Sequence, residues 1–125
     1  MSYDSNEQDL DLSFLFEIAD GSNEFIVDSI VMFLQQTPEL LQSTGTAIEA
    51  QDWAAAASSA HKLKPNLGFF GMLNSQALLQ EIELLCKSSA PDAGDIAVKF
   101  NTIQQIINNN LVELEKIKLE KEAEL

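Results

Sequence analysis

Apolar positions recur along most of the chain at intervals of three and four residues, a spacing that places them on one side of an α-helix. No stretch shows the alternation with a period of two that is typical of a β-strand. Polar residues that favour helix starts, such as Ser22, Asn23 and Asp52, precede several of the periodic segments. The pattern therefore predicts helices in five segments, at about residues 12–19, 22–51, 52–70, 75–86 and 96–117.

Four of these helices are substantial and are joined by short links, which predicts an all-α fold. We expect an antiparallel four-helix bundle with up-down-up-down topology over residues 11–118, including a short extra helix at its N-terminal end. Residues 1–10 are predicted to be a flexible acidic N-terminus, and residues 119–125 a charged helix end that projects or frays. Pro38 leaves two interpretations open, because it either kinks one long helix or starts a second one.

The composition indicates one domain inside the cell. The chain has 125 residues, 46% of them apolar, which is enough for a single hydrophobic core. Its one cysteine, Cys86, excludes an internal disulfide and fits a reducing cytosol. No apolar run approaches the ~18 residues needed to cross a bilayer, and the N-terminus lacks the pattern of a secretory signal. We therefore expect a cytoplasmic protein with no membrane segment.

Charge narrows the classes of partner. Twenty acidic residues oppose seven lysines, and the formal net charge is −13. A nucleic-acid binder needs cations to displace counterions from phosphates, so this chain is predicted to bind no nucleic acid and no anionic membrane surface. The acidity favours solubility or attraction to a basic partner.

The single histidine lies in the stretch AHKLKPNLGFFG, at position 61. On a helical wheel, His61 falls well outside the arc of the apolar residues, so it is expected to face solvent. Its own face carries only small or compact residues, which would let another protein approach the ring closely: Ala54, Ala57, Ser58, Pro65 and Gly68.

The charge around His61 differs from that of the rest of the chain. Residues 53–80 contain no Asp or Glu, while Lys62 and Lys64 are the only cations among the first 86 residues. This electropositive island suits an anion with more than one charge.

A metal site needs several ligands that the chain does not supply near His61, and Cys86 lies on an apolar stripe. No acidic group is close in sequence to orient the ring. Two interpretations remain, an ordinary surface histidine and a nucleophile that accepts a phosphoryl group.

The same stretch resembles the active helix of histidine-containing phosphotransfer (HPt) domains. Their pattern is histidine, any residue, an aliphatic residue, lysine and glycine, with a further glycine six residues later. Here those positions hold the residues His61, Lys62, Leu63, Lys64, Pro65 and Gly71. The likeness covers about residues 12–115, although the specific motif is only a dozen residues long.

The resemblance implies a phosphocarrier of a two-component phosphorelay, not an enzyme with kinase activity. His61 would be the phosphoacceptor, and Lys64 with Lys62 would stabilise the phosphoryl group. Ala57, Ser58, Pro65, Gly68 and Gly71 would form the surface that a partner approaches. The partners would be response-regulator receiver domains or a hybrid sensor histidine kinase. The chain would act as a monomer. It would need no cofactor or metal of its own, because the receiver supplies the Mg²⁺.

Pro65 departs from the family pattern, which has glycine at that position. A proline inside a helix removes the amide that would bond the His61 carbonyl and typically costs ~3 kcal/mol. The helix is therefore expected to kink or end early there. The alternative function is a degenerate or unrelated helical adaptor that binds partners without carrying phosphate.

The segment EFIVDSIVMFL, residues 24–34, holds more apolar residues than one buried stripe needs. One interpretation is a fully buried central helix. The other is that Ile26 and Ile30 form an apolar patch near His61 on which the partner docks.

Overall fold

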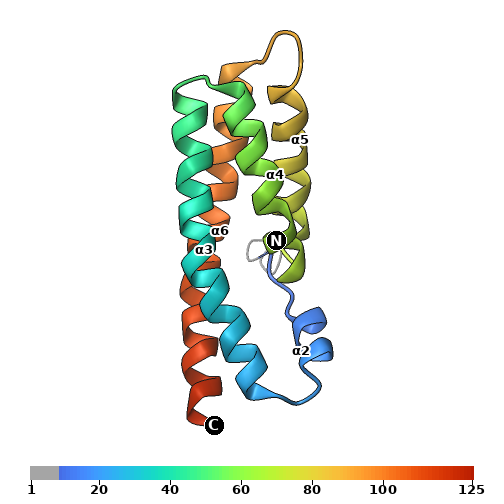
Figure 1. The fold of residues 1–125 in the computed structure, drawn as a ribbon, viewed down its shortest axis with the longest axis vertical. Coiled ribbons are helices and arrows are strands. Elements are labelled where there is room, and N and C mark those ends of the chain that lie inside the picture. The colour runs from blue at the N-terminus through green and yellow to red at the C-terminus, as the bar shows by residue number, and fades with distance from the viewer. Residues whose placement is uncertain (1–8) are drawn as a thin grey trace, which may run out of the picture.

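The computed structural model describes residues 9–125, which form five helices and no strand, and this confirms the predicted all-α class. The helices are α2 (Ser13–Ala19), α3 (Asn23–Glu49), α4 (Trp53–Phe69), α5 (Leu73–Cys86) and α6 (Ala93–Ala123). In Figure 1, α3 to α6 run lengthwise as a bundle. Both α3 and α5 pack against α4 and α6, as expected for a four-helix bundle.

The short helix α2 completes the lower part of the bundle. Because α4 and α5 are shorter than α3 and α6, they do not reach the lower end in Figure 1, and α2 lies beyond the end of α4. Leu15 and Ala19 of α2 are buried in the core, and α2 contacts α3. The short N-terminal helix of the prediction is thus part of the packed body.

Side-chain caps begin the longer helices where the sequence placed them. The Ser22 hydroxyl accepts a hydrogen bond from the Phe25 amide at the start of α3. The Asp52 carboxylate likewise accepts from the Ala55 amide at the start of α4. These caps satisfy amides that have no partner inside the helix.

Pro38 does not divide the segment that contains it. Helix α3 runs unbroken from Asn23 to Glu49 with Pro38 inside it, so the interpretation of two helices is wrong. Pro38 itself is exposed on the surface of the bundle, whereas the preceding Thr37 is buried.

The prediction of a flexible segment over residues 1–10 is wrong for its last two residues, while residues 1–8 lie outside the described part. The buried Asp9 carboxylate accepts hydrogen bonds from the amides of Asn74 and Ser75, at 3.0 and 2.7 Å. Asn110 donates to the Asp9 carbonyl, and Leu10 packs against the core. Asp9 thereby caps α5, which has no local side-chain cap.

The charged end of α6 does not project or fray as expected. The helix continues to Ala123, and the Asn23 amide group donates to the Glu124 carboxylate at 3.0 Å. The Lys121 ammonium lies 5.5 Å from the centre of the Phe16 ring. Contacts to α2 and α3 therefore hold this end against the body.

Within residues 9–125, no helix combines the length and the apolar character that crossing a bilayer requires.

Candidate functional site

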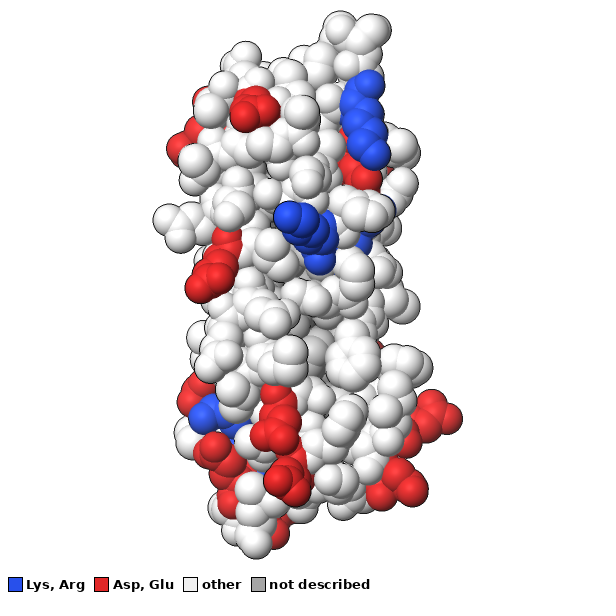
Figure 2. All heavy atoms as spheres, viewed as in Figure 1, with Lys and Arg blue, Asp and Glu red and all other residues white. Residues whose placement is uncertain are grey.

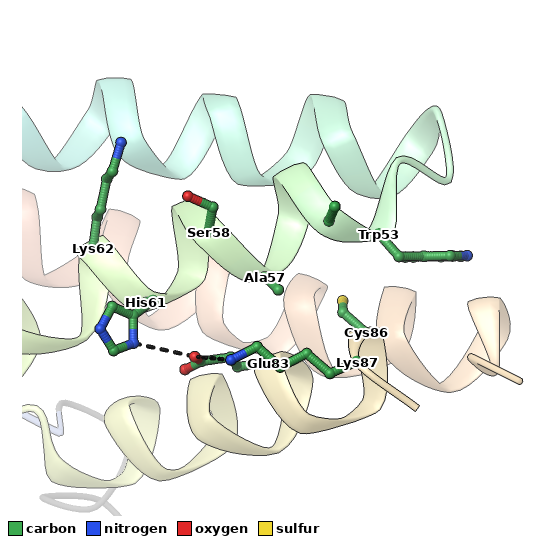
Figure 3. A pocket seen from close by; sticks show the side chains of 9 residues that line it. Trp53, Ala57, Ser58, His61, Lys62, Glu83, Cys86 and Lys87 are labelled. Atoms are coloured by element: carbon green, nitrogen blue, oxygen red, sulfur yellow. Dashed lines mark hydrogen bonds and ion pairs between the residues drawn. The ribbon is translucent and has the colours of Figure 1, made fainter. Parts of the chain in front are cut away.

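His61 lies on the outer side of α4, and 70% of its side chain is exposed, as the wheel predicted. Its Nδ1 atom lies 3.1 Å from Oε2 of Glu83, which comes from α5. Figure 3 shows Nδ1 directed toward Glu83 and the other ring nitrogen, Nε2, directed away from it. The ring is thus held by one nitrogen and open at the other.

Glu83 is the centre of an ionic cluster, named here the Glu83 cluster, which consists of Glu83, His61, Lys64 and Lys87. The Lys64 ammonium lies 2.7 Å from Oε1 of Glu83, and the Lys87 ammonium lies 3.1 Å from Oε2. Burial raises the pKa of Glu83, but hydrogen bonds and charge from both lysines outweigh it and lower this pKa from 4.5 to about 2. Glu83 is therefore an anion at neutral pH.

This ionisation fixes the form of the histidine ring. A carboxylate can only accept hydrogen bonds, so the proton shared with Glu83 must be carried by Nδ1 of His61. In a neutral ring, Nε2 then keeps its lone pair. The exposed nitrogen of His61 is consequently the nucleophilic one.

Sequence reasoning missed Glu83 and Lys87, because it searched for an acidic partner close to His61 in the chain. Glu83 is 22 positions away from His61 and reaches it only because α4 and α5 pack together. One signal was present, since Glu83 lies between apolar residues of α5 that are buried, such as Ile82 and Cys86. A carboxylate on a buried face requires a partner.

The predicted electropositive island is only partly correct. Lys62 and Lys64 lie near His61, but Glu83 neutralises one positive charge among them. With Lys87 included, two lysines contact the one carboxylate, so the net charge of these three side chains is still positive. On the face drawn in Figure 2, most carboxylates gather toward the lower end, away from the lysine at the middle.

The residues predicted to form a bare approach surface divide into two groups. Ser58 and Pro65 are exposed beside His61, as expected. Ala57, by contrast, is buried.

The helix α4 continues through Pro65 to Phe69, so the expected early end is wrong.

Gly68 and Gly71, which were predicted to belong to the approach surface, are half-exposed, and each also lies against another segment of the chain. A Cβ at Gly68 would meet the side chain of Gln76, which donates a hydrogen bond to the Lys64 carbonyl at 3.0 Å. A Cβ at Gly71 would overlap the backbone of Asp11, and Gly71 also has a positive φ of 70°. Gly71 needs glycine because its φ is positive and a backbone segment lies against it, whereas at Gly68 the flexible Gln76 side chain could move aside.

Two open hollows flank the ring. One of about 620 Å³ lies between α4 and α5 on the Nδ1 side, and its walls include Trp53, Ser58 and Lys87. The other, of about 560 Å³, is lined by Pro65, Leu73 and further residues of α5. His61 therefore lies on a ridge between two depressions.

The predicted docking role of Ile26 and Ile30 is wrong, because both side chains are buried in the core. The same helix instead exposes Phe25 and Met32. These two residues line a hollow of about 310 Å³ between α3 and α4, together with Phe69 and others. We name this hollow the aromatic groove.

A reactive cysteine and a metal site both have little support among the described residues. Cys86 is buried, and burial raises the pKa of its thiol, so its reactive thiolate is disfavoured. Within residues 9–125, no three His, Cys, Asp or Glu side chains lie close enough together to hold a metal ion.

Comparisons with known proteins agree with the geometry. The sequence model described as "Hpt domain" matches residues 28–117, which is most of the chain. Among solved structures, the chain is similar to the HPT domain from the Hpt sensor hybrid histidine kinase from Shewanella, with a TM-score of 0.75 and 21% identity. The match covers 91% of this chain and 97% of that one, and it shows a shared fold. No curated protein matches the sequence.

Proposed function

Since the chain belongs to the Hpt domain family, whose members are phosphocarrier modules of phosphorelays, we propose that it carries phosphate on His61. It would accept the phosphoryl group from an aspartate of one receiver domain and pass it to another. One observation carries this proposal, namely a solvent-exposed Nε2 on a ring whose Nδ1 is bonded to Glu83. That arrangement presents a nucleophile in one fixed orientation.

The transfer balances without a base on this chain. The Nε2 lone pair attacks the phosphorus of the aspartyl phosphate, and a P–N bond forms while the P–O bond to the aspartate breaks. The aspartate carboxylate leaves with the bonding electrons. The Nδ1 proton stays on the ring, which becomes positively charged, and the Glu83 carboxylate offsets that charge. Mg²⁺ and the remaining catalytic groups would belong to the receiver.

The proposal also assigns a docking surface to the receiver domain. The aromatic groove includes Phe69, eight residues after His61 on α4, which corresponds to roughly 12 Å along the helix. A standard interface buries about 800 Å² on each partner, so a receiver seated over His61 would extend this far. The exposed apolar side chains of Phe25 and Met32 are suited to such a contact.

Phosphorylation by a receiver tests the proposal. The purified chain and its His61→Gln variant are incubated with a phosphorylated receiver domain and Mg²⁺, and the label on each chain is followed. We expect label that is lost in acid and kept in base on the wild type, and none on the variant. Such a result would also mean that Pro65 is compatible with transfer.

Two other results would count against a carrier. Binding of receivers without any label would support the degenerate docking module, for which Pro65 is the motivating departure. Equal labelling of the wild type and His61→Gln would place the phosphoryl group on another residue.

A further inference from the structure

The two lysines of the Glu83 cluster are held with different strength. Lys64 contacts both Glu83 and the Gln80 side-chain oxygen, and only 18% of its side chain is exposed. Lys87 contacts Glu83 alone among the residues described, and 61% of its side chain is exposed. Lys87 is therefore the more loosely held of the two cations.

The cost in stability of moving each lysine away from Glu83 also differs. The Glu83–Lys87 contact joins residues four positions apart on α5, and its lysine end is largely exposed to water, which screens the charge on that side of the pair. Glu83 itself is buried, with 6% of its side chain exposed. Removing Lys64 from it would leave a buried carboxylate short of its closest cation, which is costly. Lys87 is free to change partner, whereas Lys64 is not.

Lys87 is also placed beside the reacting ring. Its ammonium and the His61 Nδ1 atom both contact the same oxygen of Glu83, each at 3.1 Å. Lys62 is adjacent to His61 in sequence, but in Figure 3 its side chain extends away from the ring toward α3. Glu83 thus holds the Lys87 ammonium on the Nδ1 side of the ring (Figure 3), and this exposed side chain must swing around the ring to reach a phosphoryl group on Nε2.

We infer that Lys87 leaves Glu83 to bind the phosphoryl group on His61, while Lys64 remains the counter-ion of Glu83. This inference rests on the proposed function and differs from the role that the resemblance gives to Lys64. A phosphoryl group brings nearly two negative charges and strong acceptor oxygens. An exposed ammonium that already lies beside the ring gains more from these oxygens than from a carboxylate shared with Lys64 and His61.

Chemical phosphorylation tests the inference without any receiver. Phosphoramidate serves as the donor: its P–N bond breaks, a bond from Nε2 of His61 to phosphorus forms, and ammonia leaves. The equilibrium extent of phosphorylation is measured by ³¹P NMR at fixed ammonia concentration. The variants are Lys87→Gln, Lys87→Arg and the control Lys116→Gln, a lysine of similar exposure that is paired with Glu113 on α6.

We expect Lys87→Gln to lower the equilibrium constant for phosphorylation about 3- to 10-fold, the effect of one partly exposed charge-assisted hydrogen bond. Lys87→Arg should restore most of it, and Lys116→Gln should leave it unchanged. In lysine side-chain NMR spectra, phosphorylation should shift the Lys87 resonances far more than those of Lys64.

Two contrary outcomes have different meanings. If His61 becomes phosphorylated but Lys87→Gln matches the wild type, or if Lys64 shows the larger shift, the inference is overturned while the carrier function stands. If folded wild-type protein takes no phosphoryl group from phosphoramidate or from receivers, the proposed function fails and the inference falls with it.

Discussion

The two sides of α4 are built from different chemistry. Toward α5, the Glu83 cluster brings four ionisable side chains together over small residues such as Ala57. Toward α3, the contacts are aromatic, with ring centres 4.5 Å apart for Phe33 and Phe70 and 5.4 Å apart for Phe69 and Phe70.

The contrast shows that the two sides of α4 have different tasks. One side fixes the position of the helix, and the other sets the chemistry of His61. Apolar burial on the α3 side fixes α4 in position without directing any charge at a ligand. Charge on the α5 side contributes less to folding, because desolvation of Glu83 offsets much of the gain from its ion pairs. The same charge determines which nitrogen of His61 is nucleophilic.

The largest expected effect comes from the aromatic side. Phe70→Ala should lower the free energy of unfolding by about 3–5 kcal/mol, because it removes a buried ring that packs against Phe33 and Phe69. Urea unfolding followed by circular dichroism measures the loss. Phe16→Ala, at an exposed ring on α2, is the control and should cost under about 1 kcal/mol. Equal losses at the two positions would mean that burial of the Phe70 ring does not stabilise the α3 side of α4.

A smaller effect, with a clear pH dependence, is expected on the charged side. Folding lowers the pKa of Glu83 from 4.5 to about 2, so its contribution is fully present above pH 4.5 and is lost as the pH falls through 2. Glu83→Gln should therefore destabilise the fold by about 3 kcal/mol at pH 7. The difference from wild type should shrink steadily between pH 4.5 and 2.

Urea unfolding of the wild type and Glu83→Gln at a series of pH values from 7 to 2 measures this difference. Other carboxylates titrate in both proteins, so only the difference reports on Glu83. A difference that stays constant with pH would mean that the Glu83 cluster does not hold the carboxylate in its charged form.

The smallest expected effect tests whether the aromatic side also binds the partner. Met32→Glu places a charge in the aromatic groove at a side chain that is 55% exposed, so folding should change little. We expect the KM for transfer from a phosphorylated receiver to rise about 10-fold with kcat unchanged, because a docking contact is lost. Val112→Glu is the matched control on α6, where the side chain is 65% exposed. Equal KM values for the two variants would contradict docking at the groove.

Much of the fold was predictable because it depends on local pattern. Apolar spacing located all five helices, and Ser22 and Asp52 indicated where two of them begin. The errors have a common cause. Neither the second helix considered at Pro38 nor the early helix end considered at Pro65 occurs, because packing against neighbouring helices overrides a local propensity. Likewise, Ile26 and Ile30 were ambiguous until the position of α4 was known.

The sequence by itself determined the helical class, the outward direction of His61 and the resemblance to the HPt pattern, since each depends on residues within a few turns of one helix. The tertiary structure alone decided what surrounds the ring. Glu83 and Lys87 reach His61 from α5, Gln76 lies against Gly68, and Asp11 lies against Gly71. Charges and close contacts act through space, and separation along the chain does not indicate which of them will meet.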